Sequence, residues 1–564
     1  MPRSFGRSAI FTLVLPLVLQ AQGLPDATVQ RINQIFHPFD TITSPGCVVG
    51  VGRDGRELFA KGYGMANLEY GVPLTAQSIS ESGSVAKQFT AAALALLQLD
   101  GKLSLDDDVR RYLPEVPDFG APITIRHLLT HTSGLRDQWA LLGIMGRGPG
   151  GEVHTTNQIL DLVSRQRELN FPVGSEYLYS NTGYTLAAVI VSRVSGMPFA
   201  RFTDERLFRP LGMTHTQWRD DYRRVVPGRA TGYDFVRGAW MQDMPFTMIH
   251  GNGGLLTTVA DLLRWNDALT TGLLGKPDLT ALLETRGRLG SGRTLSYALG
   301  LRVGSYGPGV REISHGGSTA GYRTFVARYP EAKMSIAVLC NAATANPTSL
   351  AHGVMALLLP VITAAQQHST TAAQHNSTTA TRLLPTPIAV DQRALIVGQY
   401  RDPRTDDLLT VTAVGDFARL VGPSADSLRA EGDGKFSTSS GYHLTFTPAG
   451  QRASHLQVES ADGDVREMDR MTTPIAGTPV PEDLVGTFLS PELDSRIVVR
   501  LDKGRLMARL SPDDDATLLP LYTDGFRVSG SGATIRFSRD AAGRVTGARI
   551  FAGRARNVRF DKLP

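Results

Sequence analysis

The hydrophobic pattern of residues 24–360 alternates between helical and strand periods. Its strongest helical signal is residues 88–99, which are mostly small or aliphatic and are followed by Gly101, a residue suited to ending a helix. Two short apolar runs, residues 48–51 and 335–339, lie near the two ends of this region and predict buried strands. Strands at both ends with helices between them favour an α+β domain, in which helices cover an antiparallel sheet.

The pattern changes after residue 390, where short alternating runs are separated by Gly, Asp, Asn and Pro. These runs predict antiparallel strands in meanders or barrels. They also repeat weakly. Val-Gly-Gln-Tyr at 397–400 returns as Val-Gly-Thr-Phe at 485–488, and two further pairs of segments follow in the same order: 409–411 with 497–499, and 444–446 with 535–537. We therefore predict two all-β domains, residues 391–475 and 482–564.

Two segments are predicted to lie outside the folded domains. Residues 1–23 combine Arg3 and Arg7, an apolar stretch and the small-residue sequence Ala-Gln-Gly, which is the layout of a secretory signal peptide. A buried N-terminal helix is the alternative. Residues 361–390 are polar, contain a short duplication, and predict a disordered linker. We expect a secreted or periplasmic protein with no stable membrane span once the signal is cleaved.

Composition narrows the functional classes. Hydrophobic residues make up 42% and charged residues 20% of the 564 residues, which is typical of soluble globular domains. The net charge of +5 is not gathered into basic runs, so nucleic acid binding has no support. Cys47 and Cys340 are the only cysteines, too few for a disulfide framework or a metal cluster. Whether these two residues pair depends on the fold.

Ser84-Val85-Ala86-Lys87 stands at the start of the predicted helix 88–99. A serine there lies near unpaired N–H groups and the positive end of the helix dipole. A lysine three residues later lies one turn away on the same face, within reach of the hydroxyl. The hydroxyl becomes a nucleophile only if a neighbouring base takes its proton. The alternative is that Ser84 caps the helix and Lys87 is solvated.

Two further motifs follow in the sequence. Tyr179-Ser180-Asn181 precedes a helical pattern at 185–194, so Tyr179 is a candidate proton carrier and Asn181 a candidate substrate contact or helix cap. His315-Gly316-Gly317 precedes an apolar strand at 322–326. The two glycines allow close approach of a backbone or a substrate, and an edge strand there would lend an N–H group to an oxyanion hole; a simple turn is the alternative.

Together the three motifs resemble those of the penicillin-binding-protein-like serine hydrolases, which include class C β-lactamases, D-Ala-D-Ala carboxypeptidases, esterases and D-aminopeptidases. That family has S-x-x-K, Y-x-N and K-T-G or H-x-G in this order, and the likeness covers about residues 30–345. It extends to stretches between the motifs, at residues 128–135, 210–213, 251–255 and 261–265. The layout is most similar to D-aminopeptidase, in which two barrels follow the catalytic domain and a loop of the last one reaches the cleft.

The resemblance implies a role for each matching residue. Ser84 is the acylated nucleophile and Tyr179 carries the proton to the leaving group. Lys87 is the base or the group that tunes Tyr179, and the sequence leaves this open. Asn181, His315, Gly317 and Ser318 bind substrate, with the N–H groups of Ser84 and Ser318 forming the oxyanion hole. It also places Cys47 and Cys340 on neighbouring strands, and implies neither a cofactor nor a metal.

Other features have simpler interpretations. His127 and His131 would share a helix face as zinc ligands can, but no third ligand is evident. The glycine-rich residues 251–254 lack the lysine of a phosphate loop, so we expect a loop beside the cleft. A neutral His315 at the usual lysine position favours esters, D-amino acid amides or peptides over β-lactams, although Arg323 is able to supply a charge.

The sequence therefore predicts a hydrolase of small molecules or short peptides, with cell-wall peptides among the candidate substrates. A β-lactamase or D-Ala-D-Ala carboxypeptidase is the alternative within this class. A penicillin-binding sensor that is acylated without turnover, or a wall-binding protein whose β-domains carry the function, are alternatives from other classes. The oligomeric state is left open.

Overall fold

The structure is a computed structural model. It describes residues 23–148, 150, 152–272, 274, 276–307, 309–359, 387–421, 427–438, 442–459, 465–471, 482–511 and 514–564. The predicted signal peptide lies outside the described residues except for Gly23, and so does the predicted linker except for residues 387–390. No helix within the described ranges is long and apolar enough to cross a membrane.

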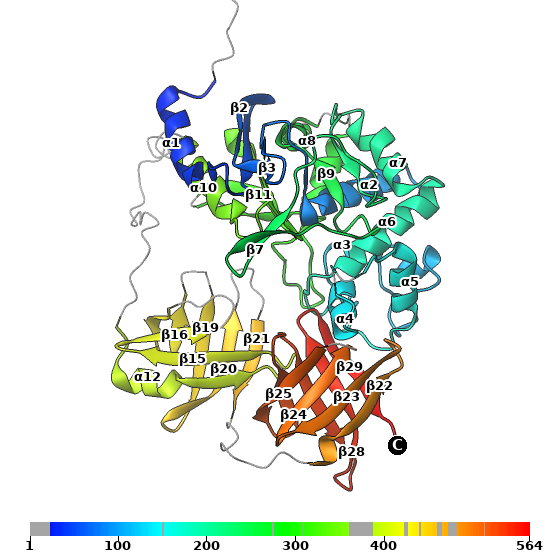
Figure 1. The fold of residues 1–564 in the computed structure, drawn as a ribbon, viewed down its shortest axis with the longest axis vertical. Coiled ribbons are helices and arrows are strands. Elements are labelled where there is room, and N and C mark those ends of the chain that lie inside the picture. The colour runs from blue at the N-terminus through cyan, green and yellow to red at the C-terminus, as the bar shows by residue number, and fades with distance from the viewer. Residues whose placement is uncertain are drawn as a thin grey trace, which may run out of the picture.

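The first domain is built on an antiparallel sheet of six described strands (Figure 1). Their order across the sheet is β10 (Arg302–Ser305), β11 (Arg311–Thr319), β12 (Tyr322–Tyr329), β13 (Met334–Cys340), β1 (Cys47–Arg53) and β2 (Arg56–Tyr63). The strands predicted at 48–51 and 335–339 are β1 and β13, which lie side by side. Strands from the two ends of the domain are therefore neighbours within its sheet.

Both faces of this sheet are covered, because successive side chains of a strand point to opposite faces. Val49 and Val51 of β1 belong to a core with α1 (Asp26–Phe36) and α10 (Pro347–Leu358). Val48 belongs to the core on the other face. There Gly50 allows α8 (Val259–Thr271) to approach, since a Cβ at this position would lie 2.9 Å from Cβ of Val259.

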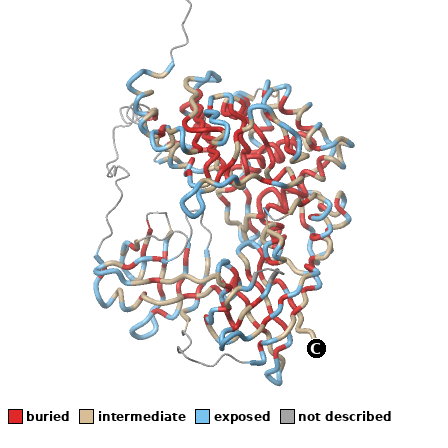
Figure 2. The backbone as a smooth tube through the Cα atoms, in the orientation of Figure 1, coloured by how far each residue is buried: buried red, intermediate tan, exposed pale blue. Residues whose placement is uncertain are grey.

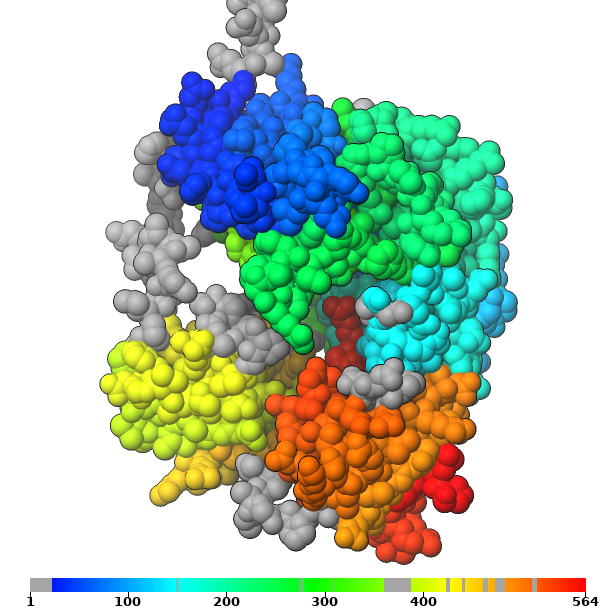
Figure 3. Space-filling model, viewed as in Figure 1, coloured from blue at the N-terminus to red at the C-terminus, as the bar shows by residue number. Residues whose placement is uncertain are grey.

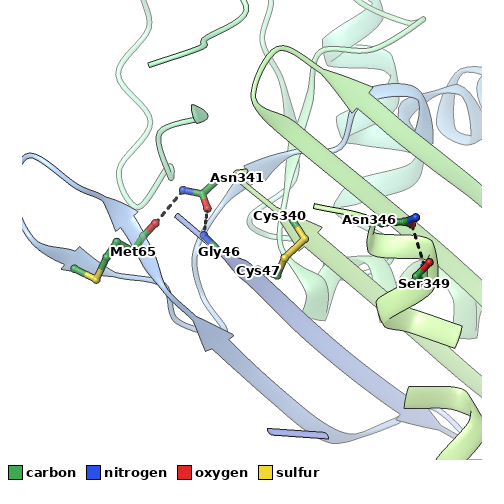
Figure 4. Close-up of a disulfide and its surroundings, with 7 residues drawn as sticks. All are labelled: Gly46, Cys47, Met65, Cys340, Asn341, Asn346 and Ser349. Atoms are coloured by element: carbon green, nitrogen blue, oxygen red, sulfur yellow. Dashed lines mark hydrogen bonds between the residues drawn. A yellow bond between two sulfur atoms is a disulfide. The ribbon is translucent and has the colours of Figure 1, made fainter. Parts of the chain in front are cut away.

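Cys47 and Cys340 are opposite each other in the β1–β13 pair and form a disulfide, with Cα atoms 3.9 Å apart (Figure 4). The expected closeness of the two cysteines is confirmed. Asn341, which follows Cys340, accepts a hydrogen bond from Gly46 N and donates one to Met65 O. Covalent and polar contacts thus hold the same strand ends together.

The helix predicted at 88–99 is α2 (Lys87–Leu99), which is buried along almost its whole length. Figure 2 shows that buried residues are concentrated in the interior of the first domain. The remaining helices of the domain surround α2 or its neighbours: α3 (Ile125–Leu129), α4 (Gln138–Ile144), α5 (Thr156–Ser164), α6 (Asn181–Ser195), α7 (Phe199–Thr203) and α9 (Pro277–Leu283). Short strands pair as β3 (Met65–Asn67) with β4 (Val72–Pro73), β5 (Ser80–Glu81) and β6 (Gln217–Trp218) with β9 (Leu255–Thr257), and β7 (Tyr233–Val236) with β8 (Ala239–Gln242).

The two C-terminal domains are all-β, as predicted, but only one is a closed barrel. The last domain closes through the pairing of β22 with β29. Its strands are β22 (Gly486–Ser490), β23 (Ser495–Asp502), β24 (Arg505–Ser511), β25 (Asp514–Tyr522), β26 (Gly525–Val528), β27 (Thr534–Arg539), β28 (Val545–Ala552) and β29 (Ala555–Lys562).

The domain before it is a half-barrel that follows a short helix, α12 (Val390–Ile396). Among the described residues its end strands β16 and β17 are not paired as a ladder, and Arg419 and Ser427 form an isolated bridge there. Its strands are β14 (Gly398–Arg401), β15 (Leu408–Val414), β16 (Phe417–Val421), β17 (Arg429–Gly432), β18 (Lys435–Ser437), β19 (His443–Ala449), β20 (Arg452–Glu459) and β21 (Val465–Arg470).

The weak sequence repeat marks equivalent strands of these two domains. The first pair of repeated segments lies in β14 and β22, the first strand of each domain. The second pair lies in β15 and β23, and the third in β19 and β27, the second and sixth strands respectively. The internal similarity therefore reflects a repeated strand order.

Candidate active site

Ser84 lies in a 3-10 turn, Gly83–Ala86, directly before α2. The sequence placed Ser84 at the opening of the helix itself, but α2 begins only at Lys87, and Ser84 forms no side-chain cap. The turn presents the serine hydroxyl 3.2 Å from the Lys87 amine. The one-turn spacing of the two residues thus brings them into contact.

Lys87 is completely buried beneath Ser84. Besides the serine hydroxyl, its Nζ contacts Asn181 Oδ1 at 2.8 Å and the carbonyl oxygen of Asn252 at 2.6 Å. Burial lowers the pKa of Lys87 well below its ordinary value; the negative charge of Asp137 opposes this effect and the positive charge of Arg554 adds to it. The environment therefore favours the neutral amine, the form that is able to accept a proton.

Tyr179 faces the same lysine, with its ring centroid 4.9 Å from Lys87 Nζ. Its ring also packs on His131, whose centroid is 4.1 Å away, and His131 Nδ1 accepts a hydrogen bond from Ser180 N. Burial raises the pKa of Tyr179, and interaction with Ser84 works in the opposite direction. Its hydroxyl has no hydrogen bond of standard geometry in the described part of the chain. Tyr179 is therefore held as a neutral phenol.

Asn181 is the first residue of α6 and is oriented by Asp137. The Asp137 carboxylate accepts hydrogen bonds from Asn181 N at 2.7 Å and from Asn181 Nδ2 at 2.9 Å. The same carboxylate caps α4 through Trp139 N and Ala140 N. The amide oxygen of Asn181 is thereby directed at Lys87. Sequence reasoning missed Asp137, because an aspartate before a helix has the ordinary signature of a cap.

His315 lies on β11 and is 5% exposed. Its Nε2 is 2.9 Å from the Tyr297 hydroxyl. Burial, with a smaller effect from the charge of Lys87, lowers the pKa of His315 to about 3. The imidazole is therefore neutral throughout the physiological range.

The backbone of β11 runs against the turn that carries Ser84. A Cβ on Gly317 would lie 2.0 Å from the Ser82 carbonyl oxygen, and one on Gly83 would lie 2.6 Å from Ser318 N. Gly83 also has a φ of +52°, in the region that favours glycine. Only glycine at both positions allows this approach.

A cavity of about 850 Å³ opens over this arrangement. Its wall includes Ser84, Tyr179, Asn181, His315, Gly317 and Ser318, which the sequence had singled out. Lys87 lies behind them. Asn252, Gly253 and Gly254 also line the cavity, so the glycine-rich loop does border the cleft as expected.

The last domain contributes Arg554 to the same cavity. Arg554 lies at the tip of the β28–β29 hairpin, with its guanidinium carbon 4.8 Å from the Tyr179 ring centroid. In Figure 3, dark red atoms from the end of the chain are visible between the green and cyan parts of the first domain. No signal in the sequence marks Arg554, because its place depends on how two domains pack.

His127 and His131 do not share a helix face, which corrects the sequence-based expectation. Helix α3 ends at Leu129, and His131 adopts a φ of +60°. His127 Nδ1 accepts a hydrogen bond from Thr124 N within a capping box, whereas His131 supports Ser180. Across the described residues, no group of three or more His, Cys, Asp or Glu is arranged to hold a metal.

The sequence of this chain is similar to those of known proteins. The sequence profile of the β-lactamase family, described as Beta-lactamase, matches residues 32–358. Penicillin-binding protein 4* of Bacillus subtilis (strain 168) is 31% identical over 304 residues, which are 51% of this chain and 66% of that protein. A D-aminopeptidase of Brucella canis is 25% identical over 567 residues, 96% of this chain and all of that protein.

Solved structures share the fold. A penicillin-binding protein homologue from Pyrococcus abyssi, described as octameric, has a TM-score of 0.53 at 23% identity, covering 78% of this chain and 99% of its own. D-amino acid amidase from Ochrobactrum anthropi SV3, complexed with L-phenylalanine amide, has a TM-score of 0.50 at 23% identity, covering 61% and 100%. At this level of identity the likeness concerns the fold alone.

Proposed function

Because the chain belongs to the β-lactamase family and is a serine hydrolase, we propose that it is secreted or periplasmic and cleaves ester or amide bonds through an acyl-enzyme on Ser84. The observation that carries the site assignment is the contact of Ser84 Oγ with a fully buried lysine amine at 3.2 Å. A lysine whose pKa is lowered by burial is suited to activate a serine.

In the proposed reaction, neutral Lys87 accepts the Ser84 proton as Oγ attacks the substrate carbonyl. The N–H groups of Ser84 and Ser318 stabilise the negative oxygen. Tyr179 protonates the departing oxygen or nitrogen, and Lys87 returns the proton taken from Ser84 to Tyr179. Water then attacks the acyl-enzyme carbonyl and gives a proton to Lys87, which passes it to Ser84 Oγ as the serine ester bond breaks and the acid is released. The opposite pKa shifts of Lys87 and Tyr179 support lysine as the base.

The substrates that we propose are small esters, D-amino acid amides and short peptides, including cell-wall peptides. The neutral His315 supports this choice, because it supplies no fixed charge for a carboxylate at its position. A relative that covers 96% of this chain is named a D-aminopeptidase, which makes D-amino acid derivatives the first to test.

The test combines active-site labelling with turnover. A fluorophosphonate should add one adduct to the native protein and to Ser349→Ala, a control at an exposed serine, and none to Ser84→Ala. Turnover is then measured with p-nitrophenyl esters, a D-amino acid p-nitroanilide, a cephalosporin and a D-Ala-D-Ala peptide. Labelling that persists in folded Ser84→Ala contradicts the assignment, and a burst without steady turnover identifies a sensor instead.

A further inference from the structure

The tip of the β28–β29 hairpin brings a cation from the last domain into the catalytic cavity. Arg554 is exposed, lines the cavity that contains Ser84, and lies over the Tyr179 ring. Its charge also contributes to the lowered pKa of Lys87. The guanidinium is therefore accessible to a substrate and close enough to act on the reacting groups.

The backbone of this tip is held firmly by the catalytic domain. The Arg554 carbonyl oxygen accepts hydrogen bonds from Asp137 N at 3.1 Å and from Asn170 Nδ2 at 2.9 Å. Two residues further on, Arg556 forms an ion pair with Glu176 at 3.0 Å. The main chain at Arg554 is thus positioned although it comes from another domain, and only its side chain remains to adjust.

Arg554 has no carboxylate partner among the described residues. Two of the carboxylates in the wall already have partners: Glu81 pairs with Arg219 at 2.9 Å, and Glu152 pairs with Arg147. For the third, Asp243, burial raises the pKa and thus disfavours the charged form.

The carboxylate of Asp137 lies behind the site and is occupied by Asn181. Arg323 also lines the cavity, but it donates hydrogen bonds to the carbonyl oxygens of Ala320 and Tyr322. Arg554 thus places next to Tyr179 a positive charge that has no carboxylate partner among the described residues.

We propose that Arg554 binds a carboxylate of the substrate beside Tyr179 and so selects anionic substrates for the hydrolase. This inference rests on the proposed function and narrows it: among the proposed esters, amides and short peptides, those with a carboxylate beside Tyr179 are favoured. A guanidinium offers a planar pair of donors that matches a carboxylate. A substrate with an ammonium group at this position is repelled, so a free amino terminus beside Tyr179 is disfavoured.

The experiment compares substrates that differ in one carboxylate. On the acyl side, succinyl-D-Ala p-nitroanilide is paired with acetyl-D-Ala p-nitroanilide. On the leaving side, the acetyl-D-Ala thioester of thioglycolate is paired with that of methyl thioglycolate. For each pair, the ratio of kcat/KM for the charged and neutral member is measured in the full chain, in Arg554→Gln and Arg554→Lys, and in the control Arg505→Gln, an exposed arginine of the same barrel.

We expect the full chain to prefer the carboxylate in at least one pair. Arg554→Gln should lower that ratio about 10-fold, the size expected for one charged hydrogen-bonded contact. Arg554→Lys should keep part of the preference and Arg505→Gln all of it. Added salt should reduce the ratio in the full chain, because it screens exposed charges.

A structural role for Arg554 would lower kcat/KM equally for both members of each pair and leave the ratio unchanged, which overturns the inference. So does a full chain that prefers neither carboxylate. Fluorophosphonate labelling separates the two proposals. If Ser84 is labelled and the ratio does not respond to Arg554, only the carboxylate site is wrong. If the full chain is neither labelled nor active, the proposed function fails and this inference fails with it.

Discussion

At the scale of single residues, burial sets the protonation states of the site. Lys87, Tyr179 and His315 are all removed from water, and each pKa moves in the direction that favours the neutral form. The neutral lysine accepts a proton, the neutral tyrosine donates one, and the neutral histidine does neither at ordinary pH. One physical cause thus produces three different chemical capacities.

The neutral state of His315 leads to a prediction about β-lactams. His315→Lys should raise the ratio of kcat/KM for a cephalosporin to that for a neutral ester by about 10-fold, because it adds a cation where the histidine has none. In the unmodified protein this ratio should not rise between about pH 8 and about pH 6. An ordinary histidine with a pKa near 6.5 begins to gain charge over that range, whereas His315, with a pKa of about 3, does not.

The measurement is a pH series of initial rates with both substrates on both proteins. The neutral ester serves as the internal control for general loss of activity. Efficient cephalosporin hydrolysis by the unmodified protein, or a ratio that His315→Lys fails to raise, would show that the charge at position 315 does not govern the choice.

At the scale of elements, the β1–β13 pair joins the beginning and the end of the catalytic domain. The Cys47–Cys340 disulfide closes a segment with a sequence separation of 293 residues. Both cysteines lie in the core that the sheet shares with α1 and α10, whereas α2 packs into the core on the other face. The covalent bond and the catalytic residues therefore belong to different layers.

We predict that loss of this disulfide lowers stability without altering catalysis. The double variant Cys47→Ala and Cys340→Ala should lose about 2–5 kcal/mol in free energy of unfolding, because a long closed loop is freed in the unfolded chain. Its kcat/KM at 25 °C should stay within about twofold, since neither cysteine lines the cavity. Urea unfolding with and without reductant provides the check on the native sequence, and identical curves would refute the stabilising role.

At the scale of the whole molecule, the barrel is joined to the catalytic domain by buried charge. Arg136, whose side chain is 0% exposed, forms an ion pair at 2.5 Å with Glu492, whose side chain is 3% exposed. Arg136 also donates a hydrogen bond to the carbonyl oxygen of Arg556, in the hairpin that carries Arg554. The interface therefore determines where the hairpin lies in the cleft.

Removing one charge of this pair should separate the domains. Glu492→Gln should cost about 3–5 kcal/mol, because the buried guanidinium of Arg136 loses its nearer anion and keeps only the partly exposed Glu168 at 3.6 Å. The control Asp561→Asn, which breaks an exposed pair with Arg559, should cost less than about 1 kcal/mol. Calorimetry should show that the barrel melts at a lower temperature in Glu492→Gln than in the native protein. Melting curves that match those of the control would contradict the prediction.

The sequence alone determined the local elements and the chemical groups. Helix α2, strands β1, β12 and β13, and the equivalent strands of the β-domains follow from patterns within a few residues. The three motifs also indicated Ser84, Lys87 and Tyr179. For Ser84 and Lys87 the reason is local, because residues three positions apart lie one helical turn apart. The closed barrel and the half-barrel could not be told apart, since closure depends on pairing between the first and last strands of a domain.

Only the tertiary structure decided which distant residues orient the catalytic groups and set their environment. Asp137, which caps another helix, orients Asn181. Arg554 lies over Tyr179 because its hairpin binds a distant segment of the catalytic domain. One hydrogen bond of that contact, from Arg556 N to Asn170 Oδ1, joins residues 386 positions apart. The low pKa of His315 likewise depends on the walls around it. Long-range contacts of this kind come from the packing of whole domains. No periodicity or motif near Asp137 or Arg554 indicates these contacts.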